Sequence, residues 1–210
     1  MTPHSASAAA AVSSSARSIK NNKRPIFCDM DGVLCDFNSG VMQLSGGRHP
    51  DTLSVKQIWK AVGRSPHFFL NLDWTHDGKD LWMAIRHLEP DILSGVPSSR
   101  PDEVGRQKAE WCRRHFRTST TRTINHVDMA ATRPQRHAVV SGTMKRKEPG
   151  ILNVISCWSK FKYRECVVPG SILIDDREKL GADWIKAGGT FVHHINTEMT
   201  IQKLRDLNVL

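Results

Sequence analysis

The chain has 210 residues and a mass of 23.6 kDa, enough for one sizeable domain and too little for two full-sized ones. Apolar residues make up 39% and charged residues 24%, which excludes a wholly disordered chain. No stretch approaches the roughly 18 apolar residues that a membrane span needs. The five cysteines show no CxxC pattern, so we expect reduced thiols in an intracellular protein.

The net charge of +9 is concentrated in two segments of the chain. Residues 1–24 hold four basic residues and no acidic ones, and residues 117–150 hold seven basic against two acidic residues. The rest of the chain is formally neutral. A neutral body with two basic segments differs from a uniformly basic nucleic-acid-binding protein.

The first segment, residues 1–24, is rich in Ala and Ser and has no apolar periodicity, which predicts a disordered tail. It lacks the apolar stretch of a secretory signal. Its basic, Ser-rich, acid-free composition leaves an organelle (mitochondrial) transit peptide or a nuclear address signal open beside a plain tail. A cytoplasmic location is the simplest expectation.

Short apolar runs bounded by turn residues predict buried strands. These runs lie at 26–28, 91–94, 151–157, 171–174 and 190–194. Amphipathic patterns predict helices over 101–116 and 179–187. Strands that alternate with helices predict an α/β fold, with a Rossmann-like, mostly parallel sheet flanked by helices.

Residues 37–88, between the first two strands, are expected to be mainly helical. Ser54 is a plausible cap for a helix through Val62, and Asp77 or Gly78 begins another through His87. Ligands of open α/β sheets bind beyond the carboxyl ends of the strands. This segment is therefore predicted to be a small helical cap on a core of residues 25–36 and 89–210.

Acidic side chains follow two of the predicted strands. DMDGVLCDF at 29–37 places Asp29 and Asp31 after the first strand, and ILIDD at 172–176 ends in Asp175 and Asp176. Carboxylates are typical ligands of Mg²⁺, whereas a calcium loop needs a glycine and a glutamate at positions where this sequence has other residues.

Other polar residues belong to the same predicted edge of the sheet. A third strand ends in Ser94 and Gly95, and Lys160 and Lys162 precede the second acidic pair. Two adjacent acids at a strand end repel each other unless a cation or a basic group compensates. We therefore expect one polar crevice with acids, a hydroxyl group and a lysine.

At these residues the chain resembles the haloacid-dehalogenase-like phosphohydrolases. Within that superfamily it is most similar to the 5′(3′)-deoxyribonucleotidase group and its bacterial and phage relatives. The resemblance covers roughly residues 25–116 and 151–208. Its motifs are DMDGVLCDF at 29–37, ILSGVP at 92–97, KAEWCRRHF at 108–116, and ILIDDREK with AGGTFVHH across 172–194. It implies a Mg²⁺-dependent phosphatase that hydrolyses a phosphomonoester through an aspartyl-phosphate. The expected substrate is a nucleoside monophosphate.

The resemblance also implies roles for individual residues. Asp29 matches the nucleophile, and Asp31 matches the general acid, whose backbone carbonyl also contacts the metal. Ser94 matches the hydroxyl that binds the transferring phosphoryl group, with Gly95 beside it. Asp175 matches a direct metal ligand, and Asp176 supports the metal shell.

The phosphate-binding lysine of the family is ambiguous in this sequence. Lys162 lies nearer the usual distance from the paired acids, and Lys160 is the alternative. Both are further from Asp175 than the family normally places this lysine.

Aromatic residues in or near the cap are candidates for stacking on a nucleoside base. They are Phe37, Phe68, Phe69, Trp74 and Trp82. We favour Phe37 and Phe69 as substrate-binding residues. The alternative is that each aromatic packs inside the cap.

The basic segment 117–150 replaces a short connection in the relatives and is expected to be an insertion without regular structure. It is either a solvated loop or a surface that contacts the phosphates of a nucleic acid. The alternative function is thus a nucleic-acid-associated protein, either a polynucleotide-end phosphatase or a non-catalytic binder. Base, sugar and oligomeric state stay open.

Overall fold

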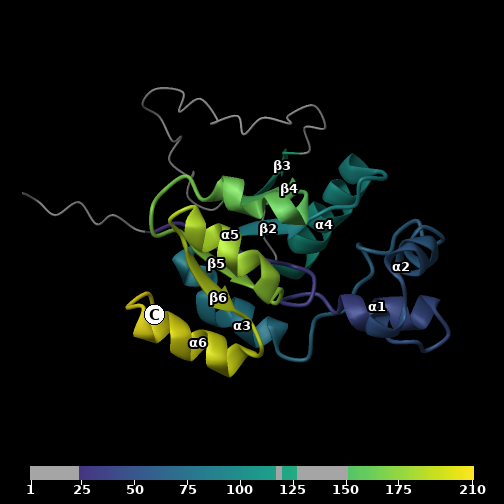
Figure 1. The fold of residues 1–210 in the computed structure, drawn as a ribbon, viewed down its shortest axis with the longest axis horizontal. Coiled ribbons are helices and arrows are strands. Elements are labelled where there is room, and N and C mark those ends of the chain that lie inside the picture. Colours follow the sequence, from purple (N-terminus) through teal and green to yellow (C-terminus); the bar gives the residue numbers. More distant parts are fainter. Residues whose placement is uncertain (1–23, 117–119, 127–150) are drawn as a thin grey trace, which may run out of the picture.

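A computed structural model describes residues 24–116, 120–126 and 151–210 (Figure 1). Within these ranges six strands form one sheet in the order β3-β4-β2-β1-β5-β6, and all neighbouring strands are parallel. The strands are β1 (Ile26–Cys28), β2 (Asp91–Gly95), β3 (Thr120–Asn125), β4 (Ile151–Cys157), β5 (Ile172–Asp175) and β6 (Thr190–His193). This arrangement confirms the expected α/β, Rossmann-like architecture.

Six α-helices lie in the described parts of the chain. They are α1 (Phe37–Leu44), α2 (Val55–Val62), α3 (Gly78–Ile85), α4 (Pro101–Phe116), α5 (Gly181–Lys186) and α6 (Thr197–Asp206). Short 3₁₀ turns are η1 (Pro50–Thr52), η2 (Arg86–Leu88), η3 (Ser159–Glu165) and η4 (Glu178–Leu180). Among the described residues, none of these helices has the length and apolar character that a bilayer crossing requires.

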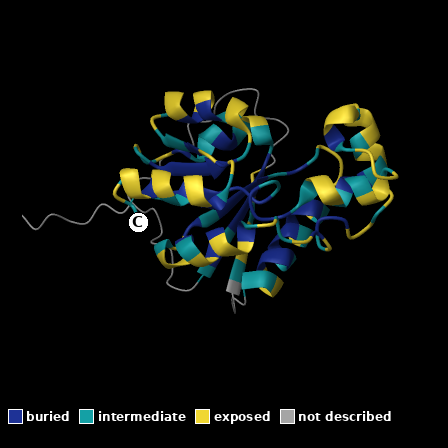
Figure 2. Ribbon diagram, turned by 90° about the horizontal axis from the view of Figure 1, so that it is seen from below, coloured by how far each residue is buried: buried dark blue, intermediate teal, exposed yellow. Residues whose placement is uncertain are grey.

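Helices cover both faces of the sheet. Successive strand residues point to opposite faces, so each face contributes its own set of apolar residues. Ile92 and its neighbours on one face pack with apolar residues of α3, α4 and α6, including Trp111. Leu93 and its neighbours on the other face pack with Trp184 of α5. In Figure 2 the central strands are buried, and exposed residues lie mainly on the outer sides of the helices.

Several predicted elements are confirmed at or near their expected bounds. Strands β1 and β4 and helix α4 have the bounds expected. The cap predicted at Ser54 also forms, and Gln57 completes a capping box: the Ser54 hydroxyl accepts from the Gln57 amide, and the Gln57 side chain accepts from the Ser54 amide. The expected helix 179–187 is shorter, because residues 178–180 form a 3₁₀ turn before α5.

The expectation of an insertion without regular structure over 117–150 is wrong for its first part. Residues Thr120–Asn125 form edge strand β3, which pairs in parallel with β4 from Thr120↔Ile151 to Asn125↔Ser156. Its β-branched threonines favour an extended backbone, although the strand has no apolar run. The rest of this segment, apart from His126, lies outside the described residues, as does the predicted tail except Arg24.

The helical segment between β1 and β2 is divided, contrary to the expectation of one cap over 37–88. Helices α1 and α2 project to one side of the sheet, and we refer to residues 37–72 as the α1–α2 segment (Figure 1). Helix α3 instead packs beside α6. The Thr197 amide donates to the Asp77 carboxylate at 2.6 Å, which fixes the start of α3 to the start of α6.

Candidate active site

Three central strands bring the predicted acidic and hydroxyl residues together at one edge of the sheet. Cys28 of β1 is in register with Ile92 of β2 and with Ile174 of β5. The residues that follow these positions therefore come together at the carboxyl ends of the three strands. Asp29, Ser94 and Asp175 are all buried there.

Lys162 lies at the centre of this buried group. Its ammonium nitrogen lies 2.8 Å from Asp29 Oδ2 and 2.6 Å from Asp175 Oδ2. Burial acts to lower the pKa of Lys162, but the charges of both carboxylates outweigh it and raise the pKa above its ordinary value. Lys162 is therefore positively charged and neutralises part of the acidic cluster.

Lys160, the alternative lysine, points elsewhere. Its ammonium lies over the rings of Trp158 and Phe161, 5.5 and 4.9 Å from their centroids, and the residue is exposed. The η3 turn thus directs two lysines that are two residues apart to different surroundings. Only Lys162 contacts the predicted nucleophile and metal ligand.

A second buried lysine at the site was missed by the sequence reasoning. Lys108 of α4 donates to Asp31 Oδ2 at 2.6 Å, to Ser94 Oγ at 2.7 Å and to the Gly95 carbonyl at 2.8 Å. A signal was present: Lys108 falls between Val104 and Cys112 at four-residue spacing, on the apolar face of the helix. A lysine on an apolar face needs a buried partner.

Asp29, Asp175 and Asp176 form the acidic cluster of the site. One carboxylate oxygen from each lies within 4.8 Å of the others. Asp176 Oδ1 is buried without a hydrogen-bond partner. The backbone at Gly32 has φ +81°, and a Cβ there would clash with the Asp176 carboxylate. Both features favour glycine at this position. Three oxygen donors with an unpaired buried oxygen fit a hard divalent cation.

Burial and mutual repulsion disfavour full ionisation of this cluster. Burial, followed by the charge of Asp29, raises the pKa of Asp175 to about 6 and that of Asp176 to about 7. Both carboxyls carry a cost when ionised in the metal-free protein. A cation would offset that cost by compensating the negative charge.

Asp31 is held by one oxygen only. Its Oδ2 accepts from Lys108, whereas its Oδ1 is buried without a hydrogen-bond partner. Burial raises the pKa of Asp31, and the charge of Lys108 opposes that rise. Raising the pKa is the direction that a carboxylic acid needs to act as a proton donor near neutral pH.

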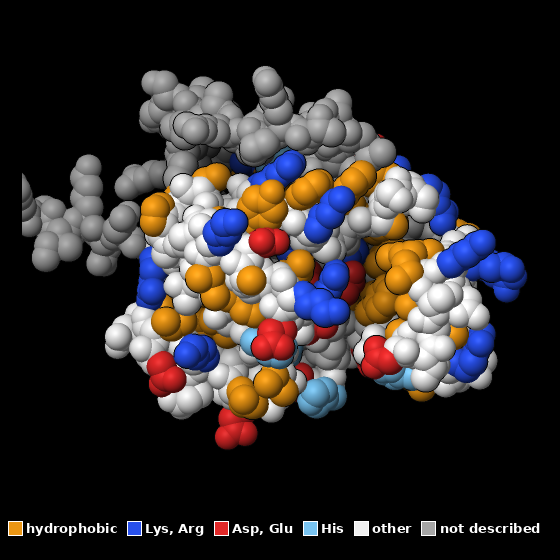
Figure 3. All heavy atoms as spheres, in the orientation of Figure 1, with side chains coloured by type: hydrophobic (Ala, Val, Ile, Leu, Met, Phe, Trp, Pro, Cys, Tyr) orange, Lys and Arg blue, Asp and Glu red, His pale blue; other side chains and the backbone are white. Residues whose placement is uncertain are grey.

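A pocket of about 280 Å³ lies above the carboxylates, between the sheet edge and the α1–α2 segment. In Figure 3 a hollow separates that segment, at the right, from the rest of the molecule, and acidic and basic side chains are visible in it. The pocket is lined by Asp31, Gly32, Phe37, Asn38, Trp59, Gly95, Val96, Ser159, Asp176 and Arg177. Trp59 was not among the aromatics predicted from the sequence.

The predicted aromatics fall into three places. Phe37 lines the pocket above the carboxylates. Trp74 and Trp82 instead pack on α4, the first on Trp111 and the second on Phe116. These two match the alternative that such residues form core. Phe68 and Phe69 are buried in the α1–α2 segment.

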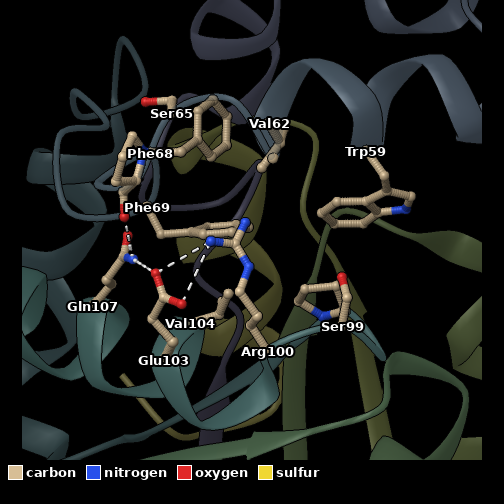
Figure 4. A pocket seen from close by; sticks show the side chains of 13 residues that line it. Trp59, Val62, Ser65, Phe68, Phe69, Ser99, Arg100, Glu103, Val104 and Gln107 are labelled. Carbon is tan, nitrogen blue, oxygen red and sulfur yellow. Dashed lines mark hydrogen bonds and ion pairs between the residues drawn. The ribbon is translucent and has the colours of Figure 1, made fainter.

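Phe69 borders a second, smaller pocket between α2 and α4 (Figure 4). There the Gln107 amide donates to the Pro66 carbonyl at 2.7 Å and to Glu103 at 3.2 Å, which attaches the α1–α2 segment to α4. The Phe69 ring lies 4.9 Å from the Lys108 ammonium. Phe69 therefore packs behind the lysine and does not line the larger pocket.

Comparisons with known proteins do not assign the chain to a family. No model of a protein family matches the chain, and no curated protein matches it, so the family resemblance seen in the motifs stays a prediction.

Proposed function

We propose that the protein is a Mg²⁺-dependent phosphomonoester hydrolase of the haloacid-dehalogenase-like type that acts on nucleoside monophosphates. One observation supports this proposal above the others. Asp29, Lys162 and Asp175 form a buried charged triad at the sheet edge, next to Asp31 and Ser94 and beneath a pocket. Such a set offers a nucleophile, a proton donor and positive charge within one small volume.

The acidic cluster supports the choice of metal. Asp29, Asp175 and Asp176 would hold the ion, with the carbonyl of Asp31 as the further ligand that the family resemblance implies. When bound, Mg²⁺ would neutralise charge on the phosphoryl oxygens. Mg²⁺ is preferred over transition metals because the donors are oxygens, with no histidine or thiolate in the described cluster.

Three residues of the chain would carry out the phosphoryl transfer itself. The Asp29 carboxylate would attack phosphorus and form an aspartyl-phosphate, which splits one difficult displacement into two easier ones. Lys162 keeps that carboxylate oriented by its 2.8 Å contact. The Ser94 hydroxyl, buried on the neighbouring strand β2, would donate to a phosphoryl oxygen.

The α1–α2 segment would act as a cap that selects the leaving group. It follows the first strand directly and places Phe37 and Trp59 on the wall of the pocket above the carboxylates. Trp59 is 38% exposed, so part of its ring is accessible to a ligand. A flat base can stack on such rings, which supports a nucleoside over a small sugar.

A phosphatase screen tests the proposal. Purified protein is assayed with nucleoside 5′- and 3′-monophosphates, phosphosugars and 5′- or 3′-phosphorylated oligonucleotides, each with Mg²⁺ and with EDTA. Release of phosphate from mononucleotides, dependent on Mg²⁺, is expected. Release from oligonucleotide ends alone would instead favour a polynucleotide-end phosphatase, and no release from any substrate would refute the proposed function.

A further inference from the structure

We propose that Arg177 makes the pocket selective for nucleotides that carry a second phosphate group, on a sugar hydroxyl other than the one that is dephosphorylated. This inference rests on the proposed phosphomonoester hydrolysis and narrows its substrate class. The second group is either the terminal phosphate of a nucleoside bisphosphate or the phosphodiester that begins an oligonucleotide. Both present a pair of phosphate oxygens to the same arginine.

Arg177 is the one positively charged residue among the described residues that line the pocket above the carboxylates. It lies at the rim of that pocket, where it precedes the 3₁₀ turn η4. Its backbone amide donates to Asp175 Oδ1 at 2.9 Å. This hydrogen bond fixes the backbone from which the side chain extends, so the position of the arginine does not depend on a bound ligand.

The guanidinium of Arg177 is available to a ligand. The residue is exposed, and its guanidinium forms no ion pair or hydrogen bond with the parts of the chain that the structure describes. Arg113 and Arg114 differ, because both bind Glu110, at 2.7 and 2.8 Å. The planar fork of N–H donors on Arg177 can therefore bind two oxygens of one phosphate at once.

The phosphoryl group that is removed has other sources of positive charge. Lys162 is buried and lies 2.8 Å from the proposed nucleophile Asp29. The proposed metal ion adds charge at the same place. Arg177 is exposed, in contrast to these buried groups, and so belongs to the solvent side of the pocket. We therefore assign it to the leaving nucleoside and not to the reacting phosphorus.

The two walls of the pocket suit two parts of such a nucleoside. Phe37 and Trp59 of the α1–α2 segment offer aromatic rings to a base, whereas Arg177 and Ser159 belong to the opposite wall, on the core. The Ser159 hydroxyl can donate a further hydrogen bond to an anion held there. The common bases and the sugar are neutral at pH 7, so a negative charge on the leaving nucleoside comes from a second phosphate.

Further cations lie beyond Ser159 on η3, which packs beside η4. The Lys160 ammonium and the Arg164 guanidinium lie over the ring of Phe161, 4.9 and 3.9 Å from its centroid. A cation–π contact uses the face of the ring and leaves N–H groups of the cation free for a phosphate. An oligonucleotide could reach these residues, whereas a nucleoside bisphosphate ends at Arg177.

The test compares three substrates that differ only in the second group. kcat/KM is measured for a nucleoside 5′-monophosphate, for its 3′,5′-bisphosphate and for a 5′-phosphorylated dinucleotide. The wild type should prefer at least one of the last two by about tenfold, the worth of one charge-assisted contact. Arg177→Gln should abolish this preference and change the rate for the monophosphate less than about 3-fold. Arg177→Lys should restore only part of it, because an ammonium lacks the planar fork.

Lys179→Gln is the matched control. It removes one exposed positive charge from η4 at a residue that does not line the pocket, and it should leave the preference unchanged. Lys160→Gln separates the two sources of the second phosphate. A preference for the dinucleotide that falls about 3-fold in this variant assigns the phosphodiester. A preference for the bisphosphate that this variant leaves unchanged assigns the terminal phosphate.

Two results would overturn the inference. One is a wild type that hydrolyses all three substrates with equal kcat/KM. The other is a uniform fall across the three substrates in Arg177→Gln, which would mean that the arginine serves the reacting phosphoryl group or the metal. A wild type that releases phosphate from none of them would refute the proposed function itself. A wild type that is active on the monophosphate but shows no preference would refute only the role of Arg177.

Discussion

The sheet edge and the α1–α2 segment meet at one pocket, but their side chains are held in very different ways. At the sheet edge Lys108 and Lys162 are buried, and each bonds two or more partners at 2.6–2.8 Å. In the α1–α2 segment, helix α1 buries only Val41 among its residues and α2 buries only Val62. Rigid charges suit a fixed reaction, whereas a lightly packed wall can adapt to a substrate.

This contrast assigns chemistry to one region and selectivity to the other. Changes at the sheet edge should therefore reduce turnover for every substrate. Changes in the α1–α2 segment should alter the preference among substrates and leave the chemical step largely intact.

The largest effect is expected from Asp29→Asn, which removes the nucleophile's charge with almost no change in shape. Turnover of every phosphomonoester should fall at least about 1,000-fold because an amide cannot form the aspartyl-phosphate. The measurement is kcat for a mononucleotide and for 4-nitrophenyl phosphate. Asp183→Asn, an exposed carboxylate on α5, is the control for loss of a charge. Activity within tenfold of wild type would contradict the covalent mechanism.

Removal of the metal is expected to reduce turnover nearly as much as Asp29→Asn does. Chelation with EDTA should abolish turnover, and added Mg²⁺ should restore it. Ca²⁺ should support it poorly, because Ca²⁺ takes roughly 6–8 ligands at longer distances than the octahedral shell of Mg²⁺. Initial rates across a metal series provide the measurement. Equal rates with Ca²⁺, or full activity in EDTA, would count against a magnesium site at Asp29, Asp175 and Asp176.

A substitution in the α1–α2 segment tests whether this segment selects the substrate. Trp59→Ala should raise KM for a nucleoside monophosphate about tenfold and change kcat little, since loss of one stacking contact costs about 1–3 kcal/mol. The rate with 4-nitrophenyl phosphate should change less. Val55→Ala, on the exposed face of the same helix, is the matched control. A large fall in kcat for both substrates would show that this segment takes part in the chemistry.

The smallest effect is expected from an ion pair outside both regions. His126, just beyond β3, lies 2.6 Å from Glu165 of η3, and this hydrogen bond raises the pKa of His126 above its ordinary value. The pair should stabilise the fold fully below about pH 6.5 and lose its effect as the pH rises through the raised pKa. Glu165→Gln should lower the melting temperature by a few degrees at pH 6 and by less at pH 9. An equal decrease at both pH values would contradict this assignment.

The sequence was most informative where one strong local pattern determines the structure. Helix α4 has the predicted bounds because Pro101 suits a first turn and the apolar spacing holds up to Phe116. Edge strand β3 was missed because Thr120–Asn125 pairs on one side only and lacks the apolar run of a central strand. Helix α6 was not predicted either, although Asn196 caps it through the Met199 amide.

The candidate site shows a similar limit. The positions of Asp29 and Asp175 at strand ends follow from local patterns, so the meeting of the two carboxylates was predictable. The direction of a side chain in a short 3₁₀ turn was not predictable. The backbone of η3 directs Lys162 into the site and Lys160 away from it. The spacing within α4 indicates that Lys108 is buried, but its partners Asp31 and Ser94 depend on how the helix packs on the sheet.

Direct capture of the aspartyl-phosphate tests the central claim most closely. Asp31→Asn is mixed with 4-nitrophenyl phosphate and Mg²⁺, quenched in acid, reduced with borohydride and mapped by mass spectrometry. This variant can form the intermediate with a good leaving group, but lacks the carboxylate that activates water for its breakdown. We expect a burst of nitrophenol and modification at Asp29, neither of which appears in Asp29→Asn. Steady hydrolysis with Asp29 unmodified would contradict the proposed function at its chemical step.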